Sequence, residues 1–281
     1  MKPITPVLRL AFCAFAGVPL LAQADVPNNI VVRAMASRSY VAPTSANPGA
    51  KPATYLFYQG HFYRGATSDP SLQSTTFDQV AHVLAPDLAR QGYFPTKDLR
   101  QADLLIVVDW GATIGQDNPN LLQEQQNLND SIAEAFRTSL TSFPGQTSLR
   151  EGGIDDILAN DQVFYAEDIS ADMSMQGTAR LLGIKGQFEH ALKASVTATN
   201  GKSYAEAAID EELKQDRYFL VVKAYDYQAI RKTGKAGRPL WSTWINLPAE
   251  VMAYSQALPA MSHAAAASFG TSTFHFRPKD K

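Results

Sequence analysis

The chain has 281 residues, of which 45% are hydrophobic and 19% are charged, and its formal net charge is −2. This composition is typical of a folded globular protein, so it argues against a chain that is disordered throughout. It also argues against a general nucleic-acid binder, because such proteins are usually basic.

The first 24 residues have the three parts of a secretory signal peptide. Lys2 and Arg9 supply positive charge, an uncharged apolar run covers residues 10–21, and Ala22-Gln23-Ala24 is a cleavage signal. The run is shorter than the about 20 residues that span a membrane, although an uncleaved anchor helix is the alternative. We therefore expect an exported chain that begins at Asp25 and resides in the periplasm or at the outer membrane.

Cys13 is the only cysteine, and it lies inside the apolar run. Because Phe12 is too bulky for the residue before a lipidated cysteine, no lipid anchor is expected. Cleavage after Ala24 leaves a chain without cysteine, hence without a disulfide or a cysteine-ligated metal. It also leaves 23 basic and 27 acidic side chains, a net charge of −4.

Residues 25–53 are rich in Pro, Ser, Asn and Gly, which predicts an extended segment with a short strand at 29–34. Residues 54–63 are rich in aromatic side chains and predict a strand, with a bulge or bend at Gly60. Thr76 and Gln79 have the spacing of a capping box, so a helix is expected from there to Gly92.

Leu104 to Val108 are five consecutive large aliphatic residues. A run without a polar face predicts a strand that is buried on both faces of a sheet. Residues 118–143 have one apolar stripe and predict a second helix, and residues 152–213 predict shorter helices.

Two further strands are predicted at 217–227 and 240–247, rich in aromatic and β-branched side chains. A loose turn around 233–237 would join them into a β-hairpin. Pro248 is expected to open a last helix that ends at Gly270, and residues 271–276 alternate like a final short strand.

This order of elements favours an α/β (α+β) fold, a mixed β-sheet with helices packed on it. We expect a single domain over residues 54–276, with a helical insertion at about 114–215. The extended segment at 25–53 would precede the domain, and a short tail at 277–281 would follow it.

Two stretches resemble a bacterial cell-envelope family of unknown function, whose members are often lipoproteins. The family pattern is a helix ending in L-x-x-x-G-[YF] and then A-D-L-[LI]-[VI], similar to Leu88–Tyr93 and Ala102–Val107. Its second half, two strands and an Ala-rich helix, looks like residues 217–270. The resemblance implies an envelope protein and transfers no catalytic residue, because none is known for the family. This chain differs from the common form in lacking a lipid-attachment sequence.

Asp109 and Trp110 follow the apolar strand directly. Ligands of α/β sheets favour the carboxyl ends of strands, so these two residues are candidate binding residues. The alternative is that Asp109 only caps a turn.

Arg231, Lys232, Lys235 and Arg238 place four positive charges within eight residues at the predicted hairpin turn. Such a cluster suits an anionic lipid surface or an acidic polymer, so these residues are also candidate binding residues. The alternative is that they keep the hairpin soluble and block the pairing of sheet edges.

No catalytic residue, metal site or cofactor is predicted. The sequence has no phosphate-binding loop, nucleophile elbow, zinc-protease or EF-hand motif, and its five histidines lack metal-ligand spacing. The acidic residues between 155 and 172 would suit either a divalent cation or a solvated surface.

Two functions stay open. The first is a non-catalytic exported protein that binds or scaffolds a component of the cell envelope. The second is an exported hydrolase whose carboxylates and histidine come from distant segments. They differ in whether Asp109, the acidic residues and a histidine meet in one concave pocket.

The signal-peptide pattern predicts that the native protein lacks residues 1–24, because the export machinery cleaves after Ala24. Intact-mass spectrometry of protein purified from its own cell envelope measures this directly. A mass that retains residues 1–24, or an acyl group on Cys13, would contradict the prediction.

Overall fold

The computed structural model describes residues 29–43, 51–116, 175–197 and 204–273. Within these residues, six strands form one mixed sheet in the order β1-β6-β5-β4-β2-β3. They are β1 (Val31–Ala36), β2 (Ala53–Tyr63), β3 (Tyr93–Pro95), β4 (Leu104–Ala112), β5 (Arg217–Asp226) and β6 (Trp241–Pro248). Strands β1, β6, β5 and β4 pair antiparallel, whereas β4, β2 and β3 pair parallel. The predicted α/β (α+β) class is confirmed.

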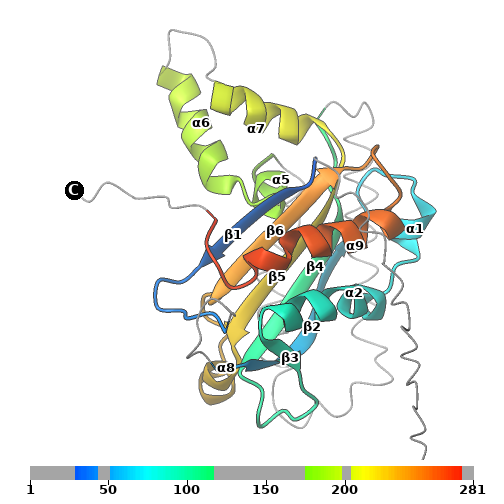
Figure 1. Cartoon of the computed structure of the whole chain (residues 1–281). Coiled ribbons are helices and arrows are strands. Elements are labelled where there is room, and N and C mark those ends of the chain that lie inside the picture. The colour runs from blue at the N-terminus through cyan, green and yellow to red at the C-terminus, as the bar shows by residue number, and fades with distance from the viewer. Residues whose placement is uncertain (1–28, 44–50, 117–174, 198–203, 274–281) are drawn as a thin grey trace, which may run out of the picture.

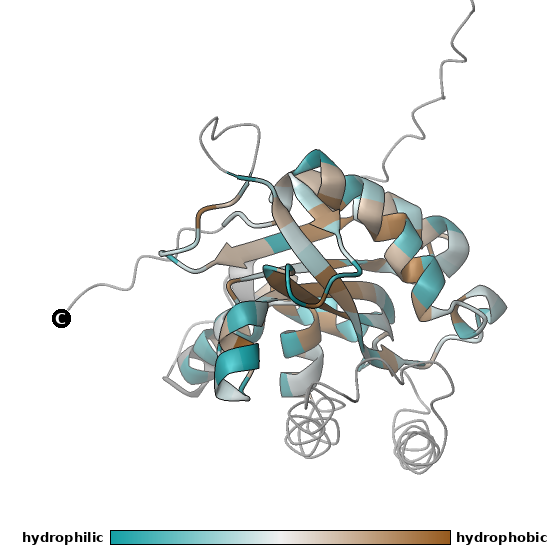
Figure 2. Ribbon diagram, turned by 90° about the horizontal axis from the view of Figure 1, so that it is seen from below, coloured by the Kyte–Doolittle hydropathy of each residue, from teal (hydrophilic) through white to brown (hydrophobic). Residues whose placement is uncertain are grey.

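Helices cover both faces of this sheet (Figure 1; Figure 2). Helices α2 (Phe77–Arg90) and α9 (Tyr254–Ala265) lie on one face, which we call the α2/α9 face. Helices α5 (Met175–Leu181), α6 (Lys185–Thr197), α7 (Tyr204–Lys214) and α8 (Tyr227–Thr233) lie on the other, the α8 face. Two short elements, α1 (Pro70–Gln73) and the 3-10 turn η2 (Ala266–Ser268), complete the described helices.

Strand β4 lies inside the sheet, between β2 and β5, and all its residues except Val107 are buried. Ile106 belongs to the main core, which it shares with α2 and α9. Leu105 points the opposite way and packs with Tyr225 and with Ile230 of α8. The interior strand predicted at 104–108 is therefore confirmed.

Helix α2 begins with the predicted capping box. The Thr76 hydroxyl accepts from the Gln79 backbone N–H, and the Gln79 side chain accepts from the Thr76 backbone N–H. The helix ends at Arg90, and Gly92 follows with a left-handed φ of +83°. A Cβ on Gly92 would overlap the carbonyl oxygen of Pro43, so only glycine fits there.

The N-terminal part of the domain differs from the prediction. Strand β1 pairs with β6 over six residues, from Val31 to Ala36, so the domain boundary expected at residue 54 is too late. Tyr40 also packs against the main core, within the segment that was expected to be extended. The partner of β1 lies about 210 residues further along the chain, where local composition gives no sign of it.

The predicted hairpin is confirmed, since β5 and β6 pair antiparallel from Arg217 with Pro248 to Ala224 with Trp241. The loose turn predicted around 233–237 follows a helix that the sequence did not predict. The Asp226 carboxylate accepts from the Ala229 backbone N–H and caps α8, which fills the first half of the link. Gly234 ends α8 in the left-handed conformation, at φ +68°. We call residues 227–240 the β5–β6 connection.

The C-terminal elements also begin later than predicted. Strand β6 includes Pro248, and α9 begins only at Tyr254, so Val251 is exposed rather than part of an apolar stripe. Residues 271–273 form no strand, although the Thr273 backbone N–H donates to the Ala34 carbonyl. Residues 274–276 of the predicted strand and the helix predicted at 118–143 lie outside the described residues.

Asp69 joins three elements through hydrogen bonds. Its carboxylate accepts from the backbone N–H of Ser71 at the start of α1, from the Tyr218 hydroxyl of β5 and from the Tyr254 backbone N–H of α9. Burial raises its pKa, but these hydrogen bonds outweigh burial and lower the pKa to about 2. A carboxyl whose pKa falls on folding stabilises the fold above its unfolded pKa of about 4, and this contribution is lost as the pH falls towards 2.

Asp69→Asn should therefore lower the free energy of unfolding at pH 7 by about 1–2 kcal/mol, because a neutral amide is the weaker acceptor. The difference from the wild type should shrink between pH 4 and pH 2, where the wild-type carboxylate itself becomes protonated. Urea unfolding across this pH range measures both effects. The control is Asp98→Asn, which changes another turn-capping aspartate with an exposed side chain. A difference that stays constant with pH would contradict the assigned role.

Candidate functional site

Asp109 lies within β4, with its carboxylate on the α8 face and almost fully buried. Lys223 of the neighbouring strand β5 donates from Nζ to Oδ2 at 2.7 Å. The backbone N–H of His61, on β2, donates to Oδ1 at 2.8 Å. The side chain thus connects three adjacent strands. It does not end the strand or cap a turn, as the sequence had suggested.

A bulge in β2 makes this arrangement possible. The pairing of β2 with β4 shifts register between Gln59 and Phe62, which directs the His61 N–H towards the carboxylate. Gly60 lies directly beside Asp109, and a Cβ there would overlap its Oδ1 atom. The bulge predicted at Gly60 is confirmed, and the Asp109 carboxylate leaves no space for a side chain at this position.

The electrostatics keep Asp109 ionised. Burial raises the pKa of its carboxyl, but the Lys223 ammonium and His61 outweigh burial and hold this pKa well below its usual range. A general base works best with a pKa near the operating pH, and Asp109 is far from that condition. The Nδ1 atom of His61 lies 3.6 Å from Oδ1, which is longer than a hydrogen bond. This geometry is that of a buried ion pair that stabilises the sheet.

Trp110 does not share a site with Asp109. Its side chain lies on the α2/α9 face, where its ring packs against Phe62 and Phe77 at centroid distances of 5.7 and 5.9 Å. Successive residues of a strand point to opposite faces, so these two candidate residues are separated by the sheet. The two candidate residues therefore do not line one common site, and their binding roles stay predictions.

A second carboxylate near a histidine lies between α2 and α9. Asp87 is buried, accepts from the Ser262 hydroxyl at 2.5 Å and forms an ion pair with Arg90. The Nδ1 atom of His263 lies 3.7 Å from Asp87. A serine nucleophile needs its hydroxyl bonded to a base, usually the imidazole, but the Ser262 hydroxyl donates its one proton to Asp87, and the Val83 carbonyl oxygen lies 3.3 Å away. The cluster joins two helices, and nothing in the sequence spacing identified it.

The four basic candidates lie on the β5–β6 connection, and all are exposed. Arg231 and Lys232 occupy the last turn of α8, and Lys235 and Arg238 follow the helix. Hydrogen bonds from Thr233 to the Ala229 and Lys235 carbonyls hold this connection in place. Within the described residues, none of the four basic side chains forms an ion pair. The structure thus brings these candidates together on one ordered surface.

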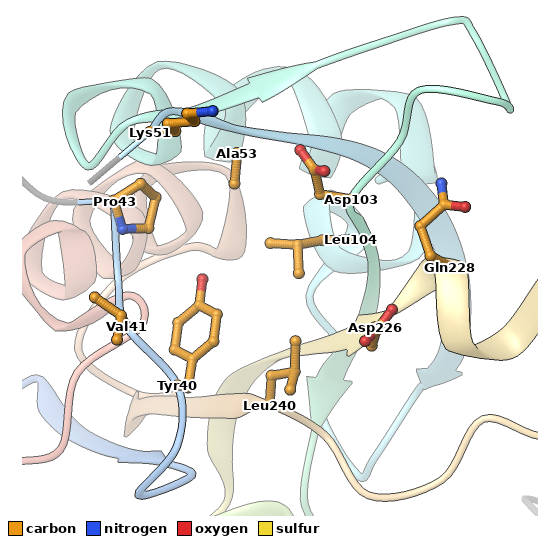
Figure 3. A pocket seen from close by; sticks show the side chains of 10 residues that line it. All are labelled: Tyr40, Val41, Pro43, Lys51, Ala53, Asp103, Leu104, Asp226, Gln228 and Leu240. Atoms are coloured by element: carbon orange, nitrogen blue, oxygen red, sulfur yellow. The ribbon is translucent and has the colours of Figure 1, made fainter. Parts of the chain in front are cut away.

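A hollow of about 350 Å³ lies beside the connection, at the end of the sheet where β4 begins and β5 ends (Figure 3). Tyr40, Leu104 and Leu240 supply apolar surface, and the carboxylates of Asp103 and Asp226 supply negative charge. These residues come from four separate parts of the chain. Sequence reasoning missed the hollow for that reason.

The described ranges of the chain contain neither a cluster of metal ligands nor a helix that could span a membrane. In those ranges, no three side chains of His, Asp or Glu gather as ligands for a metal ion. None of the helices described there is both long and apolar enough to cross a membrane. The acidic residues between 155 and 172, named as a cation site or a solvated surface, lie outside the described part of the chain.

Comparison with known proteins assigns no family to this arrangement. The chain matches no family model, and it has no significant match among curated proteins.

The buried pair predicts strong coupling between Asp109 and Lys223. Lys223→Met should lower the free energy of unfolding by about 3 kcal/mol, because it leaves a buried carboxylate without its cation. Asp109→Asn keeps an acceptor for the His61 N–H. In the double variant, Lys223→Met with Asp109→Asn, the free energy of unfolding should fall by less than the sum of the two single decreases, with a difference of at least about 1 kcal/mol.

Urea unfolding of the four proteins gives this coupling energy. Lys235→Met is the matched control, because it removes an exposed lysine and should change stability by about 0.5 kcal/mol or less. Single variants as stable as the control would show that water screens the pair and that Asp109 does not stabilise the sheet.

Proposed function

We propose that the chain is an exported cell-envelope protein that acts by binding, and that the basic side chains of the β5–β6 connection attach it to an anionic surface. The observation that carries this proposal is the exposure, on one segment, of four cations that form no ion pair with any residue the structure describes. Export rests on the signal-peptide pattern, and the resemblance to an envelope family stays a prediction that agrees with it.

Two structural explanations for these cations are incomplete. Cations in the last turn of a helix interact favourably with its dipole, but this effect fades beyond that turn. It therefore accounts for Arg231 and Lys232 and leaves Lys235 and Arg238 unexplained. Protection of a sheet edge does not apply, because β5 and β6 both lie inside the sheet, between β1 and β4.

The charge of the rest of the molecule makes the cluster stand out. Without the signal peptide the chain carries a net charge of −4, so its overall charge does not favour an anionic partner. Basic side chains near an anionic membrane contribute about 1 kcal/mol each. Four of them give about 4 kcal/mol, which corresponds to weak, reversible and oriented attachment.

An exported hydrolase is the second candidate, because Asp109 and His61 do lie side by side. Lys223 already pairs with the Asp109 carboxylate, however, and the Ser262 hydroxyl donates to Asp87 rather than to an imidazole. The described side chains that resemble catalytic groups are thus engaged in holding the fold together. Binding is the function that this geometry supports best.

Replacing Arg231, Lys232, Lys235 and Arg238 together by serine should abolish association with vesicles that contain phosphatidylglycerol. The wild type should bind these vesicles at about 0.05 M salt and lose most binding by about 0.5 M, because salt screens exposed charges. Co-sedimentation across the salt series measures this. The fold should persist, since the four side chains are exposed.

The matched control replaces four dispersed exposed cations, Arg64, Lys97, Lys185 and Lys214, by serine. This control has the same net charge as the first variant. If the β5–β6 connection has a specific role, the control should bind the vesicles nearly as well as the wild type does. Equal loss in both variants would mean that net charge alone governs association. No binding by the wild type at low salt would refute the proposal.

A further inference from the structure

The hollow at the end of the sheet is built from fixed elements. Leu104 and Asp226 form the last residue pair between β4 and β5, and the hollow begins where this pairing ends. Asp103 precedes that pair, Leu240 precedes β6, and Tyr40 follows β1. Figure 3 shows the phenol of Tyr40 and the carboxyl groups of Asp103 and Asp226 around one open space.

Each carboxylate is held by one of its two oxygens. The Oδ2 atom of Asp103 accepts from the Thr54 N–H at 2.8 Å and from the Thr54 hydroxyl at 2.9 Å. The Oδ1 atom of Asp226 accepts from the Ala229 N–H at 2.8 Å. The second oxygen of each, Oδ1 of Asp103 and Oδ2 of Asp226, has no donor within the described part of the chain. Both groups are therefore positioned by the fold and still able to accept.

Apart from Lys51 and Gln228, the rest of the lining is apolar or aromatic. Leu104 is buried, and Leu240 packs against the main core. The Tyr40 hydroxyl forms a hydrogen bond of 2.9 Å with the Tyr93 hydroxyl, which holds the ring in place. Burial raises the pKa of the Tyr40 phenol, and its hydrogen bond with Tyr93 opposes part of this rise, so the phenol stays neutral at pH 7.

We propose that this hollow binds a small organic cation, whose amine or guanidinium group lies between Asp103 and Asp226 and whose apolar body lies against Tyr40 and Leu240. Charge-assisted hydrogen bonds to carboxylates are the strong ones, and an aromatic ring also attracts a cation. Lys51 on the rim offsets only one of the two negative charges. A volume of about 350 Å³ falls at the small end of ligand sites.

Other ligand classes fit less well. Calcium takes six to eight oxygen ligands, and this hollow offers two carboxylates. An anion would meet both negative charges. The inference is independent of the proposed attachment to an anionic surface, because the four basic side chains do not line the hollow.

Phenethylamine is a suitable probe, with 2-phenylethanol as its neutral analogue of nearly equal shape. Titration of the full mature chain, followed by NMR at low salt, should show that the amine binds at least ten-fold more tightly than the alcohol. Asp103→Asn and Asp226→Asn should each weaken amine binding by about ten-fold, since each removes one charge-assisted contact. Asparagine keeps an acceptor for the Thr54 or Ala229 N–H, so both variants should fold.

Two further variants complete the test. Lys51→Met removes a repelling cation and should tighten amine binding by a few-fold, a change that a merely structural role of the carboxylates would not produce. Asp98→Asn removes an exposed negative charge outside the hollow and should leave the affinity unchanged. Equal affinity for the amine and the alcohol, or unchanged affinity in both Asp103→Asn and Asp226→Asn, would overturn the proposal.

Amine binding by the four-fold serine variant of the β5–β6 connection separates the two sites. We expect that variant to bind phenethylamine as the wild type does, although it no longer binds anionic vesicles. Loss of amine binding in that variant, with the fold intact, would show that the two sites are one and would contradict the inference of a separate cation site.

Discussion

Strand β4 has to be covered on both faces, and this requirement organises the molecule. Its aliphatic residues leave no side for water, so α2 and α9 pack on one face and α8 packs on the other. Asp109 is the one ionised side chain within β4. It is tolerated there because Lys223 supplies the opposite charge and the His61 N–H supplies a hydrogen bond. Gly60, which has no side chain, leaves space for the carboxylate. The residue that most resembles a catalytic group in the sequence is therefore part of the sheet itself.

The same separation between interior and surface bears on function. Three buried or half-buried carboxylates of the described residues are paired: Asp109 with Lys223, Asp87 with Ser262 and Arg90, and Glu212 with Arg33. Four exposed cations and two carboxylates lie at one end of the sheet, on and beside the β5–β6 connection. There the cations of α8 face outward, and two carboxylates border a hollow. This distribution of charge is the basis of our proposal that the protein acts by binding.

Much of the fold was predictable because its strongest signals are local. Five aliphatic residues in a row identified β4, the spacing of Thr76 and Gln79 identified the start of α2, and Gly60 identified the bulge. The start of α8 was missed because Tyr227 and Ile230 suit a strand as well as a helix. The cap that Asp226 provides decides between the two. The pairing of β1 with β6, and the hollow, depend on contacts between segments far apart in the chain, which periodicity and propensity do not contain.

The central claim is that the β5–β6 connection, and not the Asp109 cluster, is the surface through which the protein acts. Amide chemical-shift mapping of the mature chain against nanodiscs containing phosphatidylglycerol tests it most directly. The claim predicts salt-sensitive shifts concentrated in residues 229–240, with the amides of His61, Asp109 and Lys223 unchanged. Shifts centred on those three residues, or spread evenly over the surface, would contradict it.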